Sequence, residues 1–428
     1  MPVALTRFEF APMTVPINAR SYEELDDFLF DPAAVKRCIA INFCGRAGSL
    51  LLHSLFDGHP QILTTPPDSI LQGAIEIFPK AVKAIGKLGT VTPARAARAI
   101  FDLFRKQATS DEAFSAEFEE RFVACLSRLV SKYSGGAIDW PFFLRASFMA
   151  YAFAQRQALS RENLVLVIQQ HSDRRHTPNL LQTFEKTYFL VAVRSPAKGI
   201  DSLIRHFAFE KTWRGDPSEV TYHIMIAKYR FDLQSFVFSD QVDLLTEQAV
   251  YVSAVRFEDM HFATERLMKG ICDVLKIKWD PVLIQSTANG QPYMFPKKAA
   301  NGQVEYITGV GHRTANDTTY WGFNRFDDWR IEAVYTKLYQ SWEYPRRALL
   351  RSGVARDLIM GFFLWIPFKS ETIGWRESWK KAAPATWRQR VTLLKFWWAK
   401  YRQLRLGLKQ IRSDLGDGTV APVRLENI

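Results

Sequence analysis

Four short apolar runs, spread widely along the chain, constrain its fold more than any other feature. Each is five or six residues long and precedes turn or polar residues, and they span residues 38–43, 164–168, 188–193 and 250–255. Such runs are typical of strands that are buried on both faces of a parallel sheet. Long helical patterns separate them, for example at 94–106 and 116–132. Strands that alternate with helices imply right-handed crossovers, so the sequence predicts an α/β fold with a doubly wound parallel sheet.

A glycine-containing turn follows the first run directly, at the sheet edge where ligands of such folds bind. It consists of Cys44, Gly45, Arg46, Ala47, Gly48 and Ser49, and a helical pattern follows. Glycines let the backbone come close to a ligand, and the N–H groups at a helix start favour an anion. The turn is shorter than a Walker A loop and has no lysine before Ser49, which disfavours an ATP γ-phosphate site and leaves a 5′-phosphosulfate site open. The alternative is an ordinary strand–turn–helix connection whose glycines serve packing.

A second polar motif stands at the end of the third run. It begins with Arg194 and Pro196, and Ser202 lies eight residues after Arg194. An arginine at a strand end can fork onto phosphate oxygens, and Pro196 turns the chain into a helix that would carry Ser202 back toward the same site. The motif predicts a second phosphate position, and the alternative is a structural arginine followed by an ordinary helix serine.

Together the two motifs resemble those of the sulfotransferase family that uses 3′-phosphoadenosine 5′-phosphosulfate (PAPS). The first is similar to the family's phosphosulfate loop, whose helix closes near a His-Pro pair, here His59-Pro60, and the second to its 3′-phosphate motif. The resemblance implies a P-loop-like fold, no required metal, and Arg46 acting on the sulfuryl group. It implies that PAPS is bound by Gly45, Arg46, Ala47, Gly48, Ser49, Leu50, Arg194, Ser202 and Arg313. Leu50 stands where many members have a second hydroxyl residue, so the chain lacks one phosphate contact of the family.

The resemblance extends over about residues 38–329. Within it, residues 67–163 are unaccounted for, and we expect this helical insertion to build the acceptor pocket. Residues 289–329 are rich in glycine and polar residues and predict a long loop, which the family closes over the cofactor and which contains Arg313. Glu258 and Asp259 are similar to a strand-end motif of the family, and we expect them to cap a helix rather than to do chemistry.

The general base for the acceptor proton has three candidates. The family uses either a histidine at the end of the second strand or a carboxylate shortly after the phosphosulfate helix. His171 follows the second apolar run, His176 stands in an H-x-P context, and Asp68 lies a few residues after His59-Pro60. Histidine suits the role because its pKa lies near working pH. We rank His171 first, then His176, then Asp68; a histidine that only caps a turn is the alternative.

The basic character of the chain is concentrated in its C-terminal part. The net charge is +12, and residues 376–412 hold eleven Lys/Arg against one acid, Glu377, which makes this segment +10 by itself. At helical spacing one stripe is formed by Trp387, Val391, Leu394, Trp398, Tyr401, Leu408 and Ile411. Aromatic residues opposite basic ones are typical of a helix at an anionic membrane surface, beside which the apolar segment 358–368 could insert. The alternative is a C-terminal helix that packs on the core; nucleic acid is not expected, because the aromatics are not interleaved with the charges.

These observations divide the chain into a sulfotransferase α/β domain at 1–345 and a basic amphipathic helical tail at 346–428. Residues 1–22 hold no basic segment leading into an apolar run, and the four cysteines form no C-x-x-C pattern. We therefore expect a cytoplasmic protein, peripheral on the inner membrane if the tail is interfacial. The leading function is transfer of a sulfuryl group from PAPS to a hydroxyl or amine acceptor, with a lipid or glycolipid as one acceptor class. A small-molecule P-loop kinase and a non-catalytic, membrane-associated nucleotide-binding module are the alternatives.

Overall fold

The structure of the chain is a computed structural model. It describes residues 19–43, 46–67, 74–86, 92–107, 114–134, 138–169, 177–207, 224, 251–298, 304–311, 322–345, 363–381, 386–416 and 423–424.

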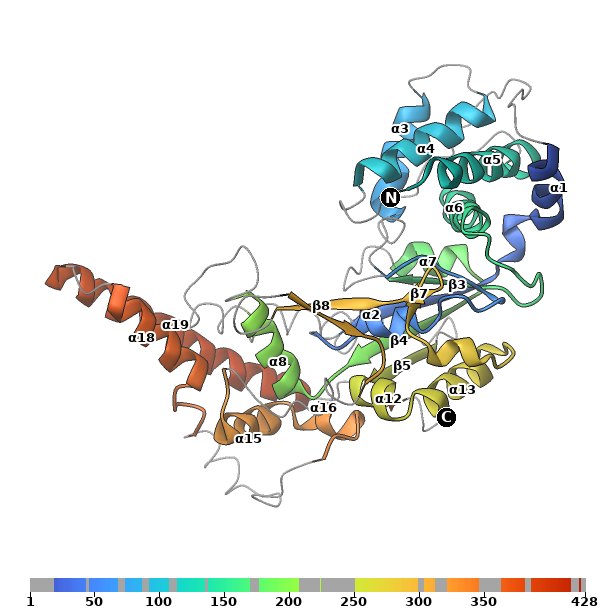
Figure 1. The fold of residues 1–428 in the computed structure, drawn as a ribbon. Coiled ribbons are helices and arrows are strands. Elements are labelled where there is room, and N and C mark those ends of the chain that lie inside the picture. The colour runs from blue at the N-terminus through green and yellow to red at the C-terminus, as the bar shows by residue number, and fades with distance from the viewer. Residues whose placement is uncertain are drawn as a thin grey trace.

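A six-stranded, fully parallel sheet forms the centre of the fold (Figure 1). Its strands are β1 (Arg37–Phe43), β2 (Ile62–Leu63), β3 (Val165–Gln169), β4 (Lys186–Val193), β5 (Tyr251–Arg256) and β10 (Val423–Arg424). They lie in the order β10-β5-β4-β1-β3-β2, and in the register Ile39 pairs with Val167 on one side and with Tyr188 on the other. The four apolar runs are therefore confirmed as β1, β3, β4 and β5, and the predicted doubly wound α/β class is confirmed.

Helices cover both faces of the sheet because strand side chains alternate between them. Ile39 and Ile41 pack on one face with the helices α2 (Ser49–Ser54) and α13 (Thr264–Leu275), beside α12 (Phe257–Phe262) and the 3-10 turn η6 (Pro281–Ile284). On the other face, Ala40 packs with α5 and α6, while Val191 and Val193 pack with α8 (Pro196–Arg205) and the C-terminal helices. The strands β1, β3, β4 and β5 are thus buried on both sides, as the unbroken apolar runs require.

A helical layer lies over the β1–β3 side of the sheet (Figure 1). It consists of α1 (Ala19–Phe28), η1 (Pro32–Ala34), α3 (Ala74–Gly86), α4 (Pro93–Gln107), α5 (Ala116–Tyr133), α6 (Trp140–Ala154) and α7 (Thr177–Thr183). The helices predicted at 94–106 and 116–132 are confirmed as α4 and α5. Ser115 and Asp139 cap α5 and α6 by accepting hydrogen bonds from the N–H groups of Phe118 (3.1 Å) and Phe142 (2.8 Å).

The C-terminal helices complete the second face of the sheet. They are α15 (Arg325–Val334), α16 (Thr336–Ser341), α18 (Lys369–Lys381) and α19 (Trp387–Gly416). Leu404, Leu408 and Ile411 of α19 are no more than 1% exposed and join the core cluster that contains Val191. The predicted amphipathic helix is present, but its stripe is divided: Tyr401, Leu408 and Ile411 are buried in the protein, whereas Trp387, Leu394 and Trp398 are exposed.

The apolar segment at 358–368 is divided in the same way. Leu364 and Phe368 are buried, whereas Trp365 and Ile366 are exposed; residues 358–362 lie outside the described part. In both segments, which apolar residues are buried depends on whether another part of the protein packs against them. The apolar pattern of the sequence is the same for a face that packs on the core and for a face that is exposed.

Part of the region predicted as a long loop at 289–329 is strand. Two antiparallel pairs lie there, β6 (Thr287–Ala288) with β7 (Gln291–Pro292) and β8 (Met294–Lys298) with β9 (Val304–Thr308). Asn289 and Gly290 connect the first pair with φ angles of 54° and 73°. Positive φ at both central residues is the geometry that an Asn-Gly hairpin turn favours, so the local turn chemistry overrides the loop expectation.

Candidate active site

The turn between β1 and α2 has the backbone geometry that its glycines predict. Gly48 is the N-cap of α2 with φ 83° and ψ 29°, a left-handed conformation that disfavours any residue with a Cβ. Gly48 has no side chain that could cap this helix start, and the first intrahelical bond runs from the Leu52 N–H to the Gly48 carbonyl at 2.9 Å. The N-cap residue therefore supplies no acceptor of its own to the first-turn N–H groups, which suits a helix start that binds an anion.

A second constraint on Gly48 is packing. A Cβ at this position would lie 2.6 Å from Cδ2 of Phe257 and 3.2 Å from Cε of Met260. Phe257 is the first residue of α12 and directly follows β5. The Phe257 ring thus lies where a Cβ of residue 48 would be. Close packing and the left-handed backbone conformation therefore both favour glycine at this position.

Arg194 stands at the carboxyl end of β4 and contacts the same ring. Its guanidinium carbon lies 4.5 Å from the centroid of Phe257. Its Nε is buried and has no hydrogen-bond partner among the described residues. Phe257 therefore connects the two motifs that resemble the phosphosulfate and 3′-phosphate sites, and Arg194 retains an unsatisfied buried donor beside them.

The helix after Arg194 begins as its Ser-Pro sequence predicts. Ser195 is the N-cap of α8 and Pro196 occupies its first turn. The Ser195 hydroxyl lies 3.2 Å from the hydroxyl of Tyr339, whose pKa burial raises. Ser202 is half-buried in the second turn of α8. The structure thus confirms the helix on which the sequence places Ser202.

The other described residues of the turn differ in exposure. Arg46 is exposed, Ala47 is buried, and Ser49 and Leu50 are half-buried. The Ser49 carbonyl accepts a hydrogen bond from Nε2 of Gln169 at 3.5 Å. Because Gln169 is the last residue of β3, the ends of β1 and β3 meet at the start of α2.

A buried histidine, His53, fixes α2 to the segment that follows β2. Nε2 of His53 lies 2.6 Å from the Thr64 hydroxyl, which follows β2, and both side chains are buried. Burial lowers the pKa of His53 to about 3, so its imidazole is neutral at ordinary pH. His53 therefore joins α2 to the chain leaving β2 through a neutral hydrogen bond.

The end of α2 is tied to the Asn-Gly hairpin. Asp57 accepts hydrogen bonds from the Thr287 hydroxyl and the Gly290 N–H, both at 2.8 Å, and the Ser54 hydroxyl lies 2.6 Å from that of Ser286. Nε2 of His59 lies 2.9 Å from the carbonyl oxygen of Lys278. The Asp57-Gly58-His59-Pro60 sequence thus fixes α2 to the elements that surround its C-terminal end.

Glu258 and Asp259 lie in the first turn of α12, as predicted. The Tyr344 hydroxyl donates to Glu258 at 2.7 Å, and Asp259 pairs with Arg256 at 3.5 Å. Burial raises the pKa of Tyr344, which keeps its hydroxyl protonated as a donor. Both acids therefore have side-chain partners within the protein, and their capping role stays a prediction.

Five predicted site residues lie outside the described part of the chain: Gly45, Asp68, His171, His176 and Arg313. β3 ends two residues before His171, at the carboxyl edge of the sheet beside β1. The described residues contain no group of three or more His, Cys, Asp or Glu that could hold a metal ion. The assignment of the base stays a prediction.

Sequence reasoning did not single out Phe257, Gln169 or His53 for the site. Each carried a usable signal: Phe257 follows β5, Gln169 ends β3, and His53 stands one turn into the helix after the glycine turn. Residues at the carboxyl ends of parallel strands are the ones that line a ligand site in such sheets.

A groove of about 1260 Å³ runs along α13. Tyr188, Tyr251, His261 and Val310 contribute to its lining, together with much of the exposed side of α13. None of the predicted cofactor residues that the structure describes lines this groove.

The sequence matches the sulfotransferase family over residues 39–281, which is more than half of the chain. The chain belongs to the sulfotransferase family. The matched region runs from β1 to the start of η6 and includes the Gly48 turn, the Arg194 motif and all three candidate bases. A comparison with curated proteins gave no match.

Three solved structures are similar to this sulfotransferase at low identity. The sulfotransferase domain of the Synechococcus PCC 7002 olefin synthase is 18% identical, with 59% of this chain and 78% of that chain covered and a TM-score of 0.30. The sulfotransferase domain from the curacin biosynthetic pathway is 15% identical, with 73% and 99% covered and a TM-score of 0.38. Sulfotransferase STF9 from Mycobacterium avium is 12% identical, with 76% and 82% covered and a TM-score of 0.32.

Proposed function

We propose that this sulfotransferase takes the sulfuryl group from PAPS and transfers it to a hydroxyl or amine acceptor. The observation that carries the proposal is Arg194 at the end of β4, whose buried Nε has no hydrogen-bond partner among the described residues and whose guanidinium lies on the Phe257 ring that packs against Gly48. This arrangement offers two anion-binding positions on adjacent strand ends, and PAPS carries anionic groups at both its 5′ and 3′ positions.

The residues present fit such a donor. The start of α2 and the side chains of Arg46 and Ser49 would hold the 5′-phosphosulfate, while Arg194 and Ser202 would hold the 3′-phosphate. PAPS supplies the activated sulfuryl group and its leaving nucleotide. Helix N–H groups cost no reorganisation when α2 is already fixed, and His53 and Asp57 fix it.

Each residue has a separate task in this proposal. Arg46 stabilises negative charge on the oxygens around the transferred group, so its contribution is largest in the transition state. The 3′-phosphate is remote from the reaction, so Arg194 holds it equally in the ground and transition states. His171, His176 or Asp68 accepts the acceptor's proton.

The acceptor class that we propose is a lipid or glycolipid at the cytoplasmic face of a membrane. The helical insertion at 67–163 would build the acceptor pocket, and the basic segment at 376–412 favours an anionic surface. No helix among the described residues is both long and apolar enough to cross a bilayer. Association of the peripheral kind is therefore what we propose.

The test is transfer from radiolabelled PAPS. The purified protein is incubated with host lipid, glycan and metabolite fractions, and we expect label in an acceptor of the lipid fraction. Arg194→Gln should lower transfer at limiting PAPS, whereas Lys198→Gln, four residues later in α8, is the matched control. Transfer of a phosphoryl group from ATP with Mg²⁺, without transfer from PAPS, would contradict the proposal.

A further inference from the structure

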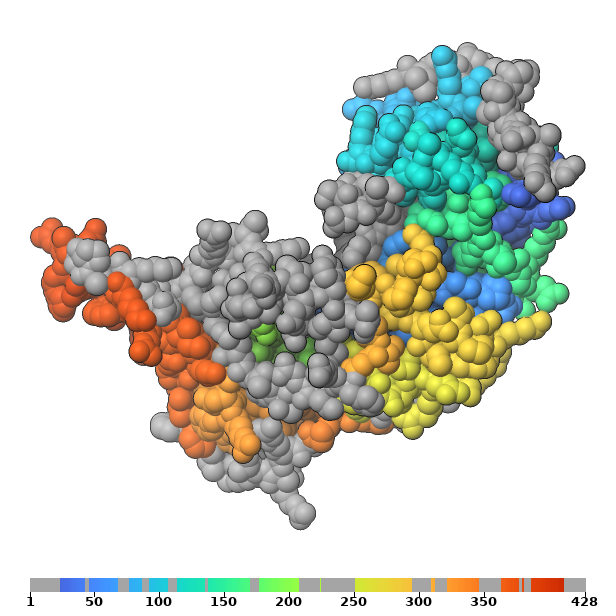
Figure 2. All heavy atoms as spheres, viewed as in Figure 1, coloured from blue at the N-terminus to red at the C-terminus, as the bar shows by residue number. Residues whose placement is uncertain are grey.

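The helices α18 and α19 form a hairpin. One end of the hairpin is buried against the protein, and the other end exposes large apolar side chains. The helices are antiparallel, because contacts pair Glu371 with Arg405 at one end and Trp379 with Trp397 toward the other. Figure 2 shows the hairpin extending from the body of the protein. We call residues 376–381 and 386–400 the hairpin tip, and the remainder of α18 and α19 the hairpin base.

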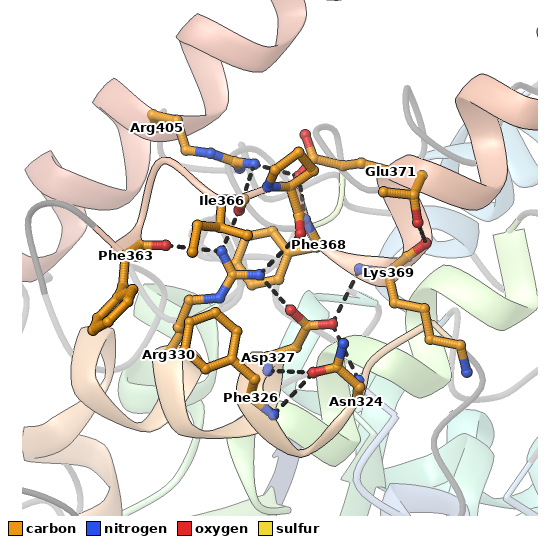
Figure 3. Close-up of polar contacts among 12 residues, drawn as sticks. Asn324, Phe326, Asp327, Arg330, Phe363, Ile366, Phe368, Lys369, Glu371 and Arg405 are labelled. Carbon is orange, nitrogen blue, oxygen red and sulfur yellow. Dashed lines mark hydrogen bonds and ion pairs between the residues drawn. The ribbon is translucent and has the colours of Figure 1, made fainter.

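A buried ion pair joins the two helices of the hairpin base, and one of its members also bonds to the segment before α18 (Figure 3). Arg405 of α19 donates to Glu371 of α18 at 2.5 Å and to the Ile366 carbonyl at 3.2 Å. Glu371 also accepts from the Phe368 N–H at 2.8 Å. The side chains of Arg405 and Glu371 are 1% and 3% exposed, so this contact is closed to solvent.

A second buried arginine ties the same region to α15. Arg330 pairs with Asp327 and donates to the carbonyls of Phe363 (3.0 Å) and Pro367 (3.2 Å). Asp327 in turn accepts from the Lys369 N–H, at the start of α18, at 3.0 Å. The base is therefore connected to the enzyme core on both helices, and the direction in which the tip points is fixed by the fold.

The hairpin tip is held together by aromatic rings and yet exposes apolar surface. Within the tip, the ring centroids of Trp379 and Trp397 lie 6.1 Å apart. Toward the base, Trp397 stacks on Trp375 at 6.1 Å and Trp398 stacks on Tyr401 at 5.5 Å. The large apolar side chains that remain exposed there are Trp379 (41%), Trp387 (72%), Leu394 (45%), Phe396 (42%) and Trp398 (61%). Trp387, Leu394 and Trp398 are spaced by seven and four residues and so share one face of α19.

Basic side chains flank this apolar face, and the segment 378–413 contains no acid. Arg388, Lys395 and Arg402 are exposed. Arg388 and Lys395 are the next residues after Trp387 and Leu394, and Arg402 lies four residues after Trp398, so all three lie on or beside this face of α19. On other sides of the tip, Arg390 lies 5.6 Å from the Trp379 ring and Lys400 lies 5.6 Å from the Phe396 ring. The exposed tryptophans of this projecting element thus have positive charge beside them.

We propose that the hairpin tip docks the protein on the surface of an anionic lipid bilayer, with Trp387, Leu394 and Trp398 in the headgroup region. Tryptophan suits this region because its ring is apolar and its N–H is polar, and the flanking Lys/Arg complement anionic headgroups. The docking surface contains no residue of the candidate active site, so it goes beyond the proposed chemistry while deepening the proposed membrane setting of the acceptor.

A bilayer fits this surface better than two other occupants. A second copy of this chain, docked tip to tip, would leave a net positive surface without complementary charge, since the tip itself offers no acid beyond Glu377 at its edge. Nucleic acid would be favoured by aromatic rings alternating with charges along one groove, whereas here the three apolar residues share a face and the charges stand beside it.

The experiment measures co-sedimentation of the full-length protein with vesicles. Vesicles of phosphatidylcholine with phosphatidylserine should bind the protein, pure phosphatidylcholine should bind it much less, and high salt should release it. The double variant Trp387→Ala/Trp398→Ala should weaken binding by about tenfold or more. Lys395→Glu should weaken it by about fivefold or more, since one basic residue near such a surface has about that effect.

Two controls separate docking from folding and from the proposed chemistry. Leu406→Ala removes a side chain of comparable exposure (51%) from the same helix outside the tip, and Lys83→Glu changes a charge on α3; both should bind vesicles as the wild type does. Thermal unfolding and binding of 3′,5′-ADP should be unchanged in the tip variants. A wild type that binds vesicles without binding 3′,5′-ADP would contradict the proposed function and leave the docking surface standing.

The proposal would be overturned by equal binding to neutral and anionic vesicles, or by wild-type binding in the Trp387→Ala/Trp398→Ala variant. It would also be overturned if a single-stranded oligonucleotide bound the tip more tightly than anionic vesicles did. Brominated lipid gives a second readout: it should quench tryptophan fluorescence in the wild type and much less in the double variant.

Discussion

At the scale of single residues, Gly48 and Arg194 meet on one ring. Gly48 lies against Phe257 and Arg194 lies over it, so the ring fixes the distance between the two motifs. Arg46 and Arg194 nevertheless have different tasks in the proposed reaction: Arg46 acts on the transferred sulfuryl group, and Arg194 binds the remote 3′-phosphate.

Gly48→Ala should destabilise the protein. A Cβ at φ 83° costs about 1 kcal/mol, and the approach to the Phe257 ring adds to that cost. Gly270 is the matched control, because it lies in α13 and a Cβ added there would have no atom within 4 Å; Gly270→Ala should be neutral or stabilise by up to about 1 kcal/mol. Urea unfolding measures both, and equal effects of the two substitutions would count against the described turn.

Arg194→Ala and Arg46→Ala should affect different kinetic constants. Loss of Arg194 should raise the KM for PAPS by about tenfold to a hundredfold with little change in kcat, because a charged hydrogen bond to a remote phosphate is lost. Loss of Arg46 should lower kcat by about tenfold to a hundredfold. Steady-state kinetics with varied PAPS checks both; no effect from either substitution would show that the motif assignment is wrong.

The buried His53 should make stability depend on pH. Its pKa is lowered to about 3 in the folded protein, whereas an unfolded histidine titrates near 6.5. Between these two values the unfolded chain binds one more proton, so the free energy of unfolding should fall as the pH falls, by up to about 1.4 kcal/mol per pH unit. His53→Gln should lose this part of the slope between pH 6 and 4.5, and an unchanged slope would show that His53 is not buried as described.

At the scale of elements, the buried pair of Arg405 and Glu371 should hold the two helices of the hairpin base together. Burial raises the pKa of Glu371 even with Arg405 beside it, so loss of the partner leaves a poorly solvated carboxyl. Arg405→Met should cost about 3–5 kcal/mol of unfolding free energy. Arg402→Met removes an exposed arginine from the same helix and should cost less than about 0.5 kcal/mol. Denaturant unfolding of the two variants would contradict this account if the costs were alike.

The elements also show what the sequence could predict. The strands β1, β3, β4 and β5 were predictable because a strand buried on both faces needs an unbroken apolar run. The division of the α19 stripe was not, because helical spacing identifies an apolar face without saying what covers it. The buried part of the stripe packs in a core cluster with Val191 and Val193 of β4, which lie far away in the chain.

The motif residues of the candidate site were predictable from the sequence, whereas the contact between them was not. The motif residues Gly48 and Arg194 stand at strand ends, which sequence order alone indicates. Their shared contact with Phe257 depends on β5 lying next to β4, and this strand order follows from pairing that no local pattern contains. The boundary at residue 345 stays a prediction.

At the scale of the whole molecule, the helical layer proposed to build the acceptor pocket and the hairpin proposed to dock on the membrane lie on different parts of the sheet. The helical layer α3–α6 lies over β1 and β3, whereas the hairpin is joined to the β4 side through α19 (Figure 1). The candidate donor site lies at the carboxyl ends of the strands between them. A membrane-docked enzyme of this shape would hold its donor site in a fixed relation to the bilayer, because the hairpin base is part of the core.

The most direct test of the central claim, a PAPS site with Arg194 at its 3′-phosphate, is thermal unfolding with nucleotides. Because a ligand that binds only the folded protein stabilises it by mass action, 3′,5′-ADP should raise the Tm more than AMP does at equal concentration, since only 3′,5′-ADP occupies both anion positions. In Arg194→Gln the two nucleotides should give nearly the same small shift, whereas Lys198→Gln should respond as the wild type does. Equal shifts with 3′,5′-ADP and AMP in the wild type would contradict the account.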